Sequence, residues 1–138
     1  MNFQMTDRAY RVCALLLLLS QSASAADAEL NPEFSICMDQ SGGGTMSMID
    51  CMGQESERQD VRLNRVYKTL MDTLPATRKT ALRDAQRAWL KYREANCDFY
   101  YEPDGGTMAR LQVNDCFMTE TAKRAKELED IQSMKEHL

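Results

Sequence analysis

The chain has 138 residues, with 17 Lys and Arg against 21 Asp and Glu and a formal net charge of −4. Residues 1–25, which are considered separately below, hold two arginines and one aspartate. The other 113 residues therefore have a net charge of −5. That length suits one small domain. The acidic balance disfavours nucleic acid and anionic membrane surfaces as partners, because both require basic patches.

Residues 1–25 have the pattern of a secretory signal peptide. Arg8 and Arg11 accompany an apolar run at residues 12–19, and residues 23–25 form a small-x-small cleavage site. The apolar run is too short to span a bilayer. We therefore expect cleavage near Ala25, no membrane anchor, and a mature protein that is periplasmic or secreted. Cys13 would be removed with the signal peptide.

Four cysteines remain in the mature segment, and their even number outside the cytoplasm predicts two disulfide bonds. Sequential pairing, Cys37–Cys51 with Cys97–Cys116, closes two short loops at low entropic cost, and we favour it for that reason. The alternative is Cys51–Cys97 with Cys37–Cys116. It stays open because Cys51 and Cys97 are at similar distances from a predicted helix turn at Leu74-Pro75.

A polar leader at residues 26–44, ending in three glycines, precedes a helical domain at residues 45–138. Apolar side chains there recur at helical spacing, and no segment shows sustained alternation of a strand. Three helices are predicted, at about residues 45–73, 75–97 and 107–136, separated by Pro75 and by a loop containing Pro103. The expected fold class is therefore all-α, a small antiparallel three-helix bundle stapled by two disulfides.

Each predicted helix carries an apolar stripe that we expect to face the core. The stripes are Leu63, Tyr67, Leu70 and Leu74; Leu82, Ala85, Trp89 and Tyr92; and Met108, Leu111, Met118, Ala122, Ala125, Leu128 and Ile131. Trp89 is the expected core anchor of the second helix. Asn64 and Gln86 lie close to these stripes, and we expect them to hydrogen-bond each other or the Trp89 indole, because buried polar groups need partners.

Several motifs spread over about residues 37–130 carry a family resemblance. They are Thr45-Met46 with Cys51, Leu63-Asn64-x-x-Tyr67, Leu82-Arg83-x-Ala85-Gln86-Arg87-Ala88-Trp89-Leu90 with Tyr92-Arg93 and Cys97, and Gly105-Gly106-Thr107 with Cys116, Thr121 and Arg124. This pattern resembles the N-terminal domain of LprI-type lysozyme inhibitors. The resemblance implies a secreted helical domain that inhibits a lysozyme, with no catalytic residues to carry over.

The residue pattern favours binding over catalysis, so we expect a non-enzyme. The single histidine, His137, is next to the end of the chain and has no partner that would make it a catalytic base. Acidic residues such as Glu55, Glu57 and Asp60 recur at helical spacing, which is typical of a solvated face. No catalytic, cofactor-binding or metal-binding residue is predicted.

Four methionines near Cys37 and Cys51 raise the alternative of a copper site, since thioethers suit Cu(I). Methionine is also a common filler of irregular core gaps, and that interpretation is favoured here. The four residues are Met38, Met46, Met48 and Met52.

The loop after the second predicted helix contains Phe99-Tyr100-Tyr101, between Asp98 and Asp104. Three consecutive aromatic residues cannot all face one core, so we predict that at least one is exposed. Tyrosine is a favoured anchor of protein interfaces, which makes Phe99, Tyr100 and Tyr101 the candidate partner-binding residues. In the alternative interpretation these rings cover the end of the bundle.

The leading functional hypothesis is a periplasmic or secreted binding protein that inhibits lysozyme by blocking its cleft sterically. Lysozymes are typically cationic, so an acidic inhibitor gains association rate by electrostatic steering. The alternative hypothesis is an envelope structural or adaptor protein with no lysozyme contact, and a third is a metal chaperone that uses the methionines. A lysozyme inhibition assay separates the first hypothesis from the others.

Overall fold

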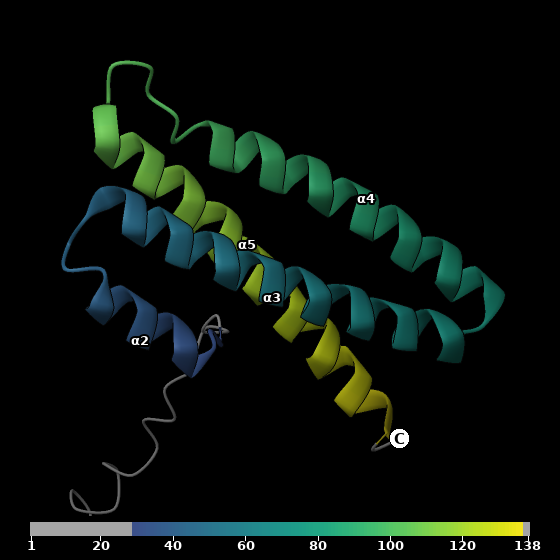
Figure 1. Ribbon diagram of the computed structural model, residues 1–138. Helices are drawn as coiled ribbons and strands as arrows, with labels where there is room; N and C mark the ends of the chain where they lie inside the picture. Colours follow the sequence, from purple (N-terminus) through teal and green to yellow (C-terminus); the bar gives the residue numbers. More distant parts are fainter. Residues whose placement is uncertain (1–28, 137–138) are drawn as a thin grey trace, which may run out of the picture.

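The computed structural model describes residues 29–136, and every regular element among them is an α-helix. The helices are α2 (Pro32–Gln40), α3 (Thr45–Thr73), α4 (Ala76–Asp98) and α5 (Gly106–Glu136). Figure 1 shows α3 and α5 running in the same general direction, α4 returning in the opposite one, and α2 folded beside the start of α3. The predicted all-α class is confirmed. The predicted signal peptide lies outside the described residues.

The prediction of three helices is wrong, because part of the leader forms a fourth helix, α2. Pro32 occupies its first turn, where the missing N–H of proline is not needed. A disulfide joins Cys37 of α2 to Cys51 of α3, with the two Cα atoms 5.7 Å apart. No residue of α2 is fully buried. A short helix without a buried stripe depends on its tether to the domain, and periodicity alone does not reveal it.

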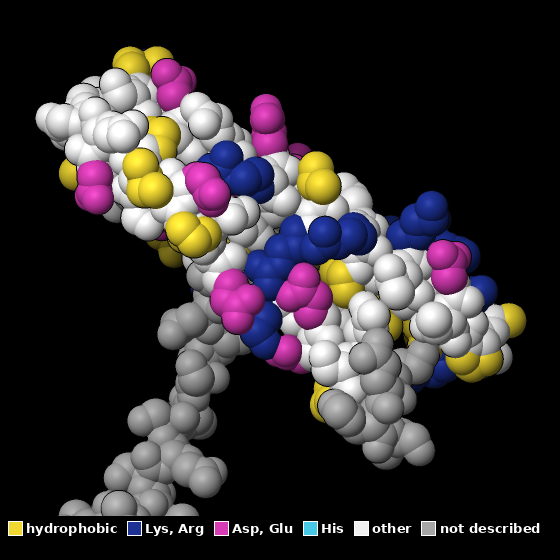
Figure 2. All heavy atoms as spheres, turned by 60° about the horizontal axis from the view of Figure 1, so that its bottom comes forward, with side chains coloured by type: hydrophobic (Ala, Val, Ile, Leu, Met, Phe, Trp, Pro, Cys, Tyr) yellow, Lys and Arg dark blue, Asp and Glu magenta, His cyan; other side chains and the backbone are white. Residues whose placement is uncertain are grey.

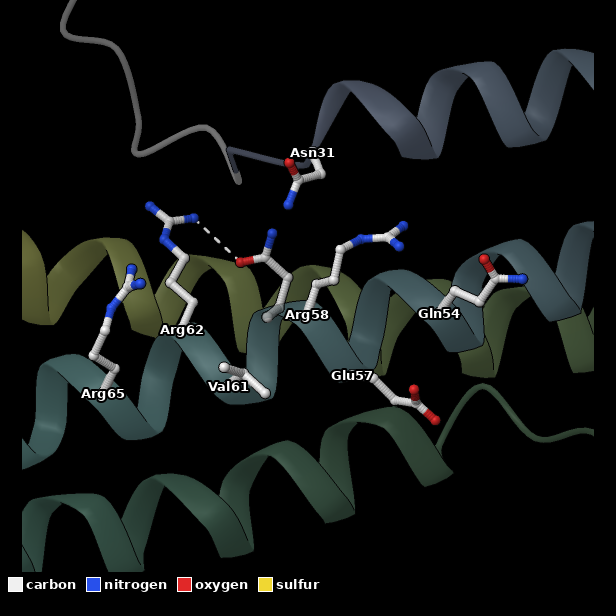
Figure 3. Close-up of a pocket in the computed structure, with 8 residues that line it drawn as sticks. Asn31, Gln54, Glu57, Arg58, Val61, Arg62 and Arg65 are labelled. Carbon is white, nitrogen blue, oxygen red and sulfur yellow. Dashed lines mark hydrogen bonds between the residues drawn. The ribbon is translucent and has the colours of Figure 1, made fainter.

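Polar contacts hold the leader against α3, on a face where Lys and Arg side chains gather across the middle (Figure 2). The Asn31 N–H donates to Glu55 Oε1 at 2.9 Å, and Gln59 Nε2 donates to the same oxygen at 2.6 Å. Gln59 Nε2 also donates to the Glu29 carbonyl at 3.1 Å. Figure 3 shows Asn31 facing the side of α3 that carries Arg62.

These contacts correct one prediction. The spacing of Glu55, Glu57 and Asp60 predicts a solvated face. Glu57 and Asp60 are exposed, but Glu55 is fully buried. Glu55 tolerates burial because its carboxylate accepts hydrogen bonds from the leader and from α3, and because Arg58 Nε lies 2.7 Å from its other oxygen.

The apolar core lies between α3 and α5, which share the most extensive helix contact in the described chain. Its buried cluster consists of Leu63, Val66, Leu70, Ala125 and Leu128. Partly buried side chains from three helices pack against this cluster: Tyr67, Leu74, Leu82, Trp89 and Ile131. The two stripes predicted for α3 and α5 therefore meet each other. The prediction is wrong for Met108, at the start of the α5 stripe, which is 61% exposed.

Helix α4 is less deeply buried than its stripe predicts. Cys97, near its end, is its only fully buried residue. Leu82 and Trp89 are partly buried and pack on the core, whereas Ala85 and Tyr92 are exposed. The expectation that Trp89 anchors the core therefore holds only in part. α4 packs mainly on α5 and leaves part of the α3–α5 pair uncovered.

Candidate partner-binding site

The loop between α4 and α5 presents three aromatic rings to solvent. Phe99 is 81% exposed, Tyr100 41% and Tyr101 59%. The rings of Phe99 and Tyr100 meet edge to face, with centroids 5.8 Å apart. The alternative interpretation, in which the rings cover the end of the bundle, requires buried rings. All three are exposed instead. Clustered exposed apolar side chains of this kind are typical of interaction surfaces.

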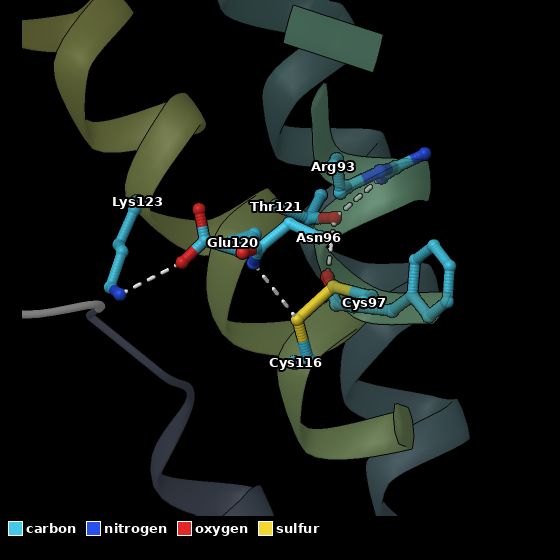
Figure 4. The surroundings of a disulfide bond; sticks show 8 residues. Arg93, Asn96, Cys97, Cys116, Glu120, Thr121 and Lys123 are labelled. Carbon is cyan, nitrogen blue, oxygen red and sulfur yellow. Dashed lines mark hydrogen bonds and ion pairs between the residues drawn. A yellow bond between two sulfur atoms is a disulfide. The ribbon is translucent and has the colours of Figure 1, made fainter. Parts of the chain in front are cut away.

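A disulfide and local hydrogen bonds hold the base of this loop. Cys97, just before the rings, is bonded to Cys116 of α5, and both cysteines are buried. The pairing in the structure is therefore sequential. The Tyr100 N–H donates to the Cys97 carbonyl at 3.1 Å. The side-chain amide of Asn96 lies 3.5 Å from Cys116 Sγ. Figure 4 shows Asn96 pointing toward this disulfide.

Two glycines bring the loop back into α5. A Cβ atom added at Gly105 would lie 2.7 Å from the Cβ of Ala109 and 2.9 Å from the Cβ of Glu102. Gly106 has a φ of 60°, in the left-handed region that glycine adopts most readily. The close approach at Gly105 and the backbone conformation at Gly106 both require glycine, so the return of the chain has a defined geometry.

Carboxylates flank the exposed rings. Asp98, Glu102 and Asp104 are all exposed, and they form no ion pair within the described chain. Their charge is thus available to an approaching cation. An acidic rim around aromatic anchors fits a basic protein surface.

Along the length of α4, two arginines join α4 to α5. Arg93 Nη1 donates to Thr121 Oγ1 at 2.6 Å, and its guanidinium carbon lies 4.8 Å from the ring centroid of Trp89. Arg124 Nε donates to Gln86 Oε1 at 3.0 Å, and its guanidinium carbon lies 5.9 Å from the Trp89 ring. All five residues belong to the motifs that carried the family resemblance. Their shared role is to hold α4 against α5.

This network replaces the predicted hydrogen bonds of Asn64 and Gln86 with each other or with the Trp89 indole, and that prediction is wrong. Gln86 uses its oxygen to accept from Arg124, and Asn64 is exposed. Arg93 also reaches α3, with Nη1 3.6 Å from Asp60 Oδ1. The sequence carried a signal for this arrangement, since Gln86, Trp89 and Arg93 are spaced to share one helix face.

The four methionines do not share one environment: Met52 is buried and Met46 is exposed. Among the described residues, no group of three or more His, Cys, Asp and Glu side chains could hold a metal ion. His137 lies outside the described residues.

The family model for the lysozyme inhibitor LprI matches residues 37–128. The chain belongs to the LprI family. The uncharacterized protein R02472 of Rhizobium meliloti (strain 1021) is 30% identical to it, over 90% of this chain and 96% of the relative. No solved structure matches the chain.

Two disulfides in an LprI family member indicate an extracytoplasmic location, because thiols stay reduced in the cytoplasm. Within residues 29–136, no helix has the length and apolar character needed to cross a membrane.

Proposed function

We propose that this protein is a periplasmic or secreted inhibitor that binds a cationic lysozyme through Phe99, Tyr100 and Tyr101 and blocks its substrate cleft. Membership of the LprI family supports lysozyme as the partner class. One structural observation supports the site, namely three exposed rings on a disulfide-held loop with an acidic rim. A steric block needs no catalytic group on the inhibitor, so the proposed action is purely one of binding.

The physical advantages of this loop are rigidity and charge. Tyrosine offers a large contact area with few rotatable bonds, so ordering it on binding costs little entropy. The Cys97–Cys116 disulfide fixes the base of the loop before binding, which lowers the cost of association further. After cleavage near Ala25 the net charge of −5 attracts a basic partner, and the acidic rim directs that attraction to the rings.

The test measures lysis of a peptidoglycan substrate by a cationic lysozyme in the presence of residues 26–138. Tyr100→Ala and Tyr101→Ala leave the net charge unchanged, and each is expected to weaken inhibition by about tenfold or more, as for a binding hot spot. Tyr92→Ala is the matched control, because Tyr92 is an exposed tyrosine on α4 outside the loop. It should inhibit like the wild-type protein. Unchanged melting temperatures would show that all three variants are folded.

The outcomes separate the site from the function. Full inhibition by both loop variants would show that these tyrosines are not the anchors. If the wild-type protein inhibits no cationic lysozyme tested, the inhibitor proposal fails and the envelope adaptor hypothesis takes its place. Added salt should slow association of the wild-type pair, because charges are screened beyond about 8 Å at physiological ionic strength.

A further inference from the structure

An apolar groove lies beside the turn between α3 and α4. This turn and the aromatic loop are at opposite ends of α4, as the ribbon in Figure 1 shows. Its volume is about 560 Å³. Apolar side chains from all three long helices line it: Leu70, Leu74, Leu82, Ala85, Leu128 and Ile131. The groove exists because α4 leaves part of the α3–α5 pair uncovered. Its volume is within the range of about 300–1,000 Å³ that is usual for small-molecule sites.

The charged residues of the groove leave a net positive charge. Arg78, Arg124 and Glu127 line it. Arg124 Nη1 lies 2.7 Å from Glu127 Oε2, so these two charges compensate each other. Arg78 forms no ion pair within the described chain. A charge that the protein does not neutralise is thus placed beside an apolar surface.

The start of α4 adds to this preference for an anion. Arg78 lies in the first turn of α4, and Pro75, the N-cap residue, also lines the groove. This helix start has no side-chain cap and no acidic residue in its first turn. Free N–H groups and the positive end of the helix dipole favour a negative group at such a position. The apolar groove therefore has, at one end, a position that favours an anion, formed by Arg78 and the first turn of α4.

We propose that this groove binds a medium-chain fatty acid. The alkyl chain lies between α3, α4 and α5, along Leu82 and Leu128, and the carboxylate lies at Arg78 and the first turn of α4. The proposal is independent of lysozyme inhibition, because the groove and the aromatic loop are at different ends of α4 and share no residue.

Equilibrium dialysis of residues 26–138 against laurate, below the concentration at which laurate forms micelles, tests the proposal. We expect saturable binding of one laurate per chain. Dodecyltrimethylammonium has an alkyl chain of the same length and the opposite charge, and it should bind about tenfold more weakly or worse. Arg78→Gln should weaken laurate binding several-fold and leave the binding of the cation unchanged or slightly stronger.

Filling the groove supplies the second arm of the test. Ala85→Trp and Ala81→Phe both place bulk on groove-lining residues of α4, and each should abolish laurate binding. Ala88→Trp is the matched control, because Ala88 is exposed on the same helix and does not line the groove. It should bind laurate like the wild-type protein. Two filling variants are used so that a folding defect in one, seen by circular dichroism, leaves the other as the test.

Three results would overturn the proposal: no saturable laurate binding, equal affinity for laurate and the cationic amphiphile, or unchanged laurate binding in a folded groove-filling variant. The lysozyme assay keeps the two proposals apart. Ala85→Trp should retain inhibition while losing laurate, and Tyr100→Ala should lose inhibition while retaining laurate.

Discussion

Arg93 shows how a charged side chain takes part in a helix interface. Its guanidinium carbon lies 4.8 Å from the ring centroid of Trp89 and 5.7 Å from that of Phe117. A desolvated cation–π contact is worth about 2 kcal/mol. Its Nε is nevertheless buried without a hydrogen-bond partner in the described chain, which costs about 1–3 kcal/mol. These two terms are of similar size and largely offset each other. The hydrogen bond to Thr121 and the ion pair with Asp60 then remain as the contacts that position Arg93 between α4, α5 and α3.

Glu55 makes stability depend on pH. Burial by itself raises the pKa of Glu55, but hydrogen bonds from Asn31, Gln59 and Arg58 outweigh burial and leave that pKa below its ordinary value of 4.5. A carboxyl group with a lowered folded-state pKa stabilises the fold above its unfolded-state pKa. That contribution is lost as pH falls through the folded-state pKa. We therefore expect the free energy of unfolding to decrease as the solution is acidified below about pH 4.5.

Urea unfolding of Glu55→Gln and wild type, at neutral and at acidic pH, measures this effect. The variant should lose less stability on acidification than the wild type. Some pH dependence should remain in it, because a hydrogen bond from Arg62 also lowers the pKa of Glu129. Glu57→Gln is the control, since Glu57 is exposed, and it should follow the wild type. Identical pH dependence in Glu55→Gln and wild type would contradict the assignment.

At the scale of elements, α3 is the helix that organises the molecule. Its buried side combines a mixed first half, which includes Glu55 and Gln59, with a wholly apolar second half. The buried residues are Cys51, Met52, Glu55, Gln59, Leu63, Val66 and Leu70. The first part of this stripe meets α2 and the leader through a disulfide and hydrogen bonds. The second part packs against α5. One continuous helix thus serves two different kinds of interface.

Two glycines, one inside α3 and one in the loop before α5, should respond to alanine in opposite directions. Gly53 is inside α3, and a Cβ added there meets nothing within 4 Å. Gly53→Ala should therefore stabilise the protein by about 0.5–1 kcal/mol through helix propensity. Gly105→Ala forces a Cβ to within 2.7 Å of the Cβ of Ala109, and should destabilise by about 1–3 kcal/mol. Denaturant midpoints measure both changes, and shifts of the same sign would contradict this account of the loop.

At the scale of the whole molecule, stability should be uneven along the chain. The buried cluster belongs to α3 and α5, while the buried residue of α4, Cys97, lies near the end of that helix. Local opening costs least where few side chains are buried. The first half of α4, beside the groove, should therefore open more readily than the centre of α3 or α5.

Hydrogen exchange followed by mass spectrometry tests this ordering. Amides of residues 76–88 should exchange faster than those of residues 59–70, because the latter contain Leu63, Val66 and Leu70 of the core. The end of α4 near the disulfide should be better protected than its start. Equal protection along α3 and α4 would mean that α4 is held as firmly as the core helices.

The sequence by itself determined the helical class, the approximate extents of α3, α4 and α5, and membership of the family. These features depend on local chemistry. Apolar spacing sets a helix and the side that it buries. Pro75 separates α3 from α4, and the glycines after Pro103 mark the start of α5. The motif around Trp89 is likewise contiguous, so it is readable without a structure.

Only the tertiary structure decided how these pieces meet. It placed Glu55 in the interior, because its partner Asn31 comes from a leader 24 residues away. It paired Arg124 with Gln86, 38 residues apart in sequence, through a hydrogen bond. It also determined which cysteines are bonded to each other. It also left the three rings and part of α4 exposed. Groups that are distant in sequence compete for the same partners, and this competition decides which side chains are buried and which are paired. Helical periodicity is a local pattern, so it carries no information about that competition.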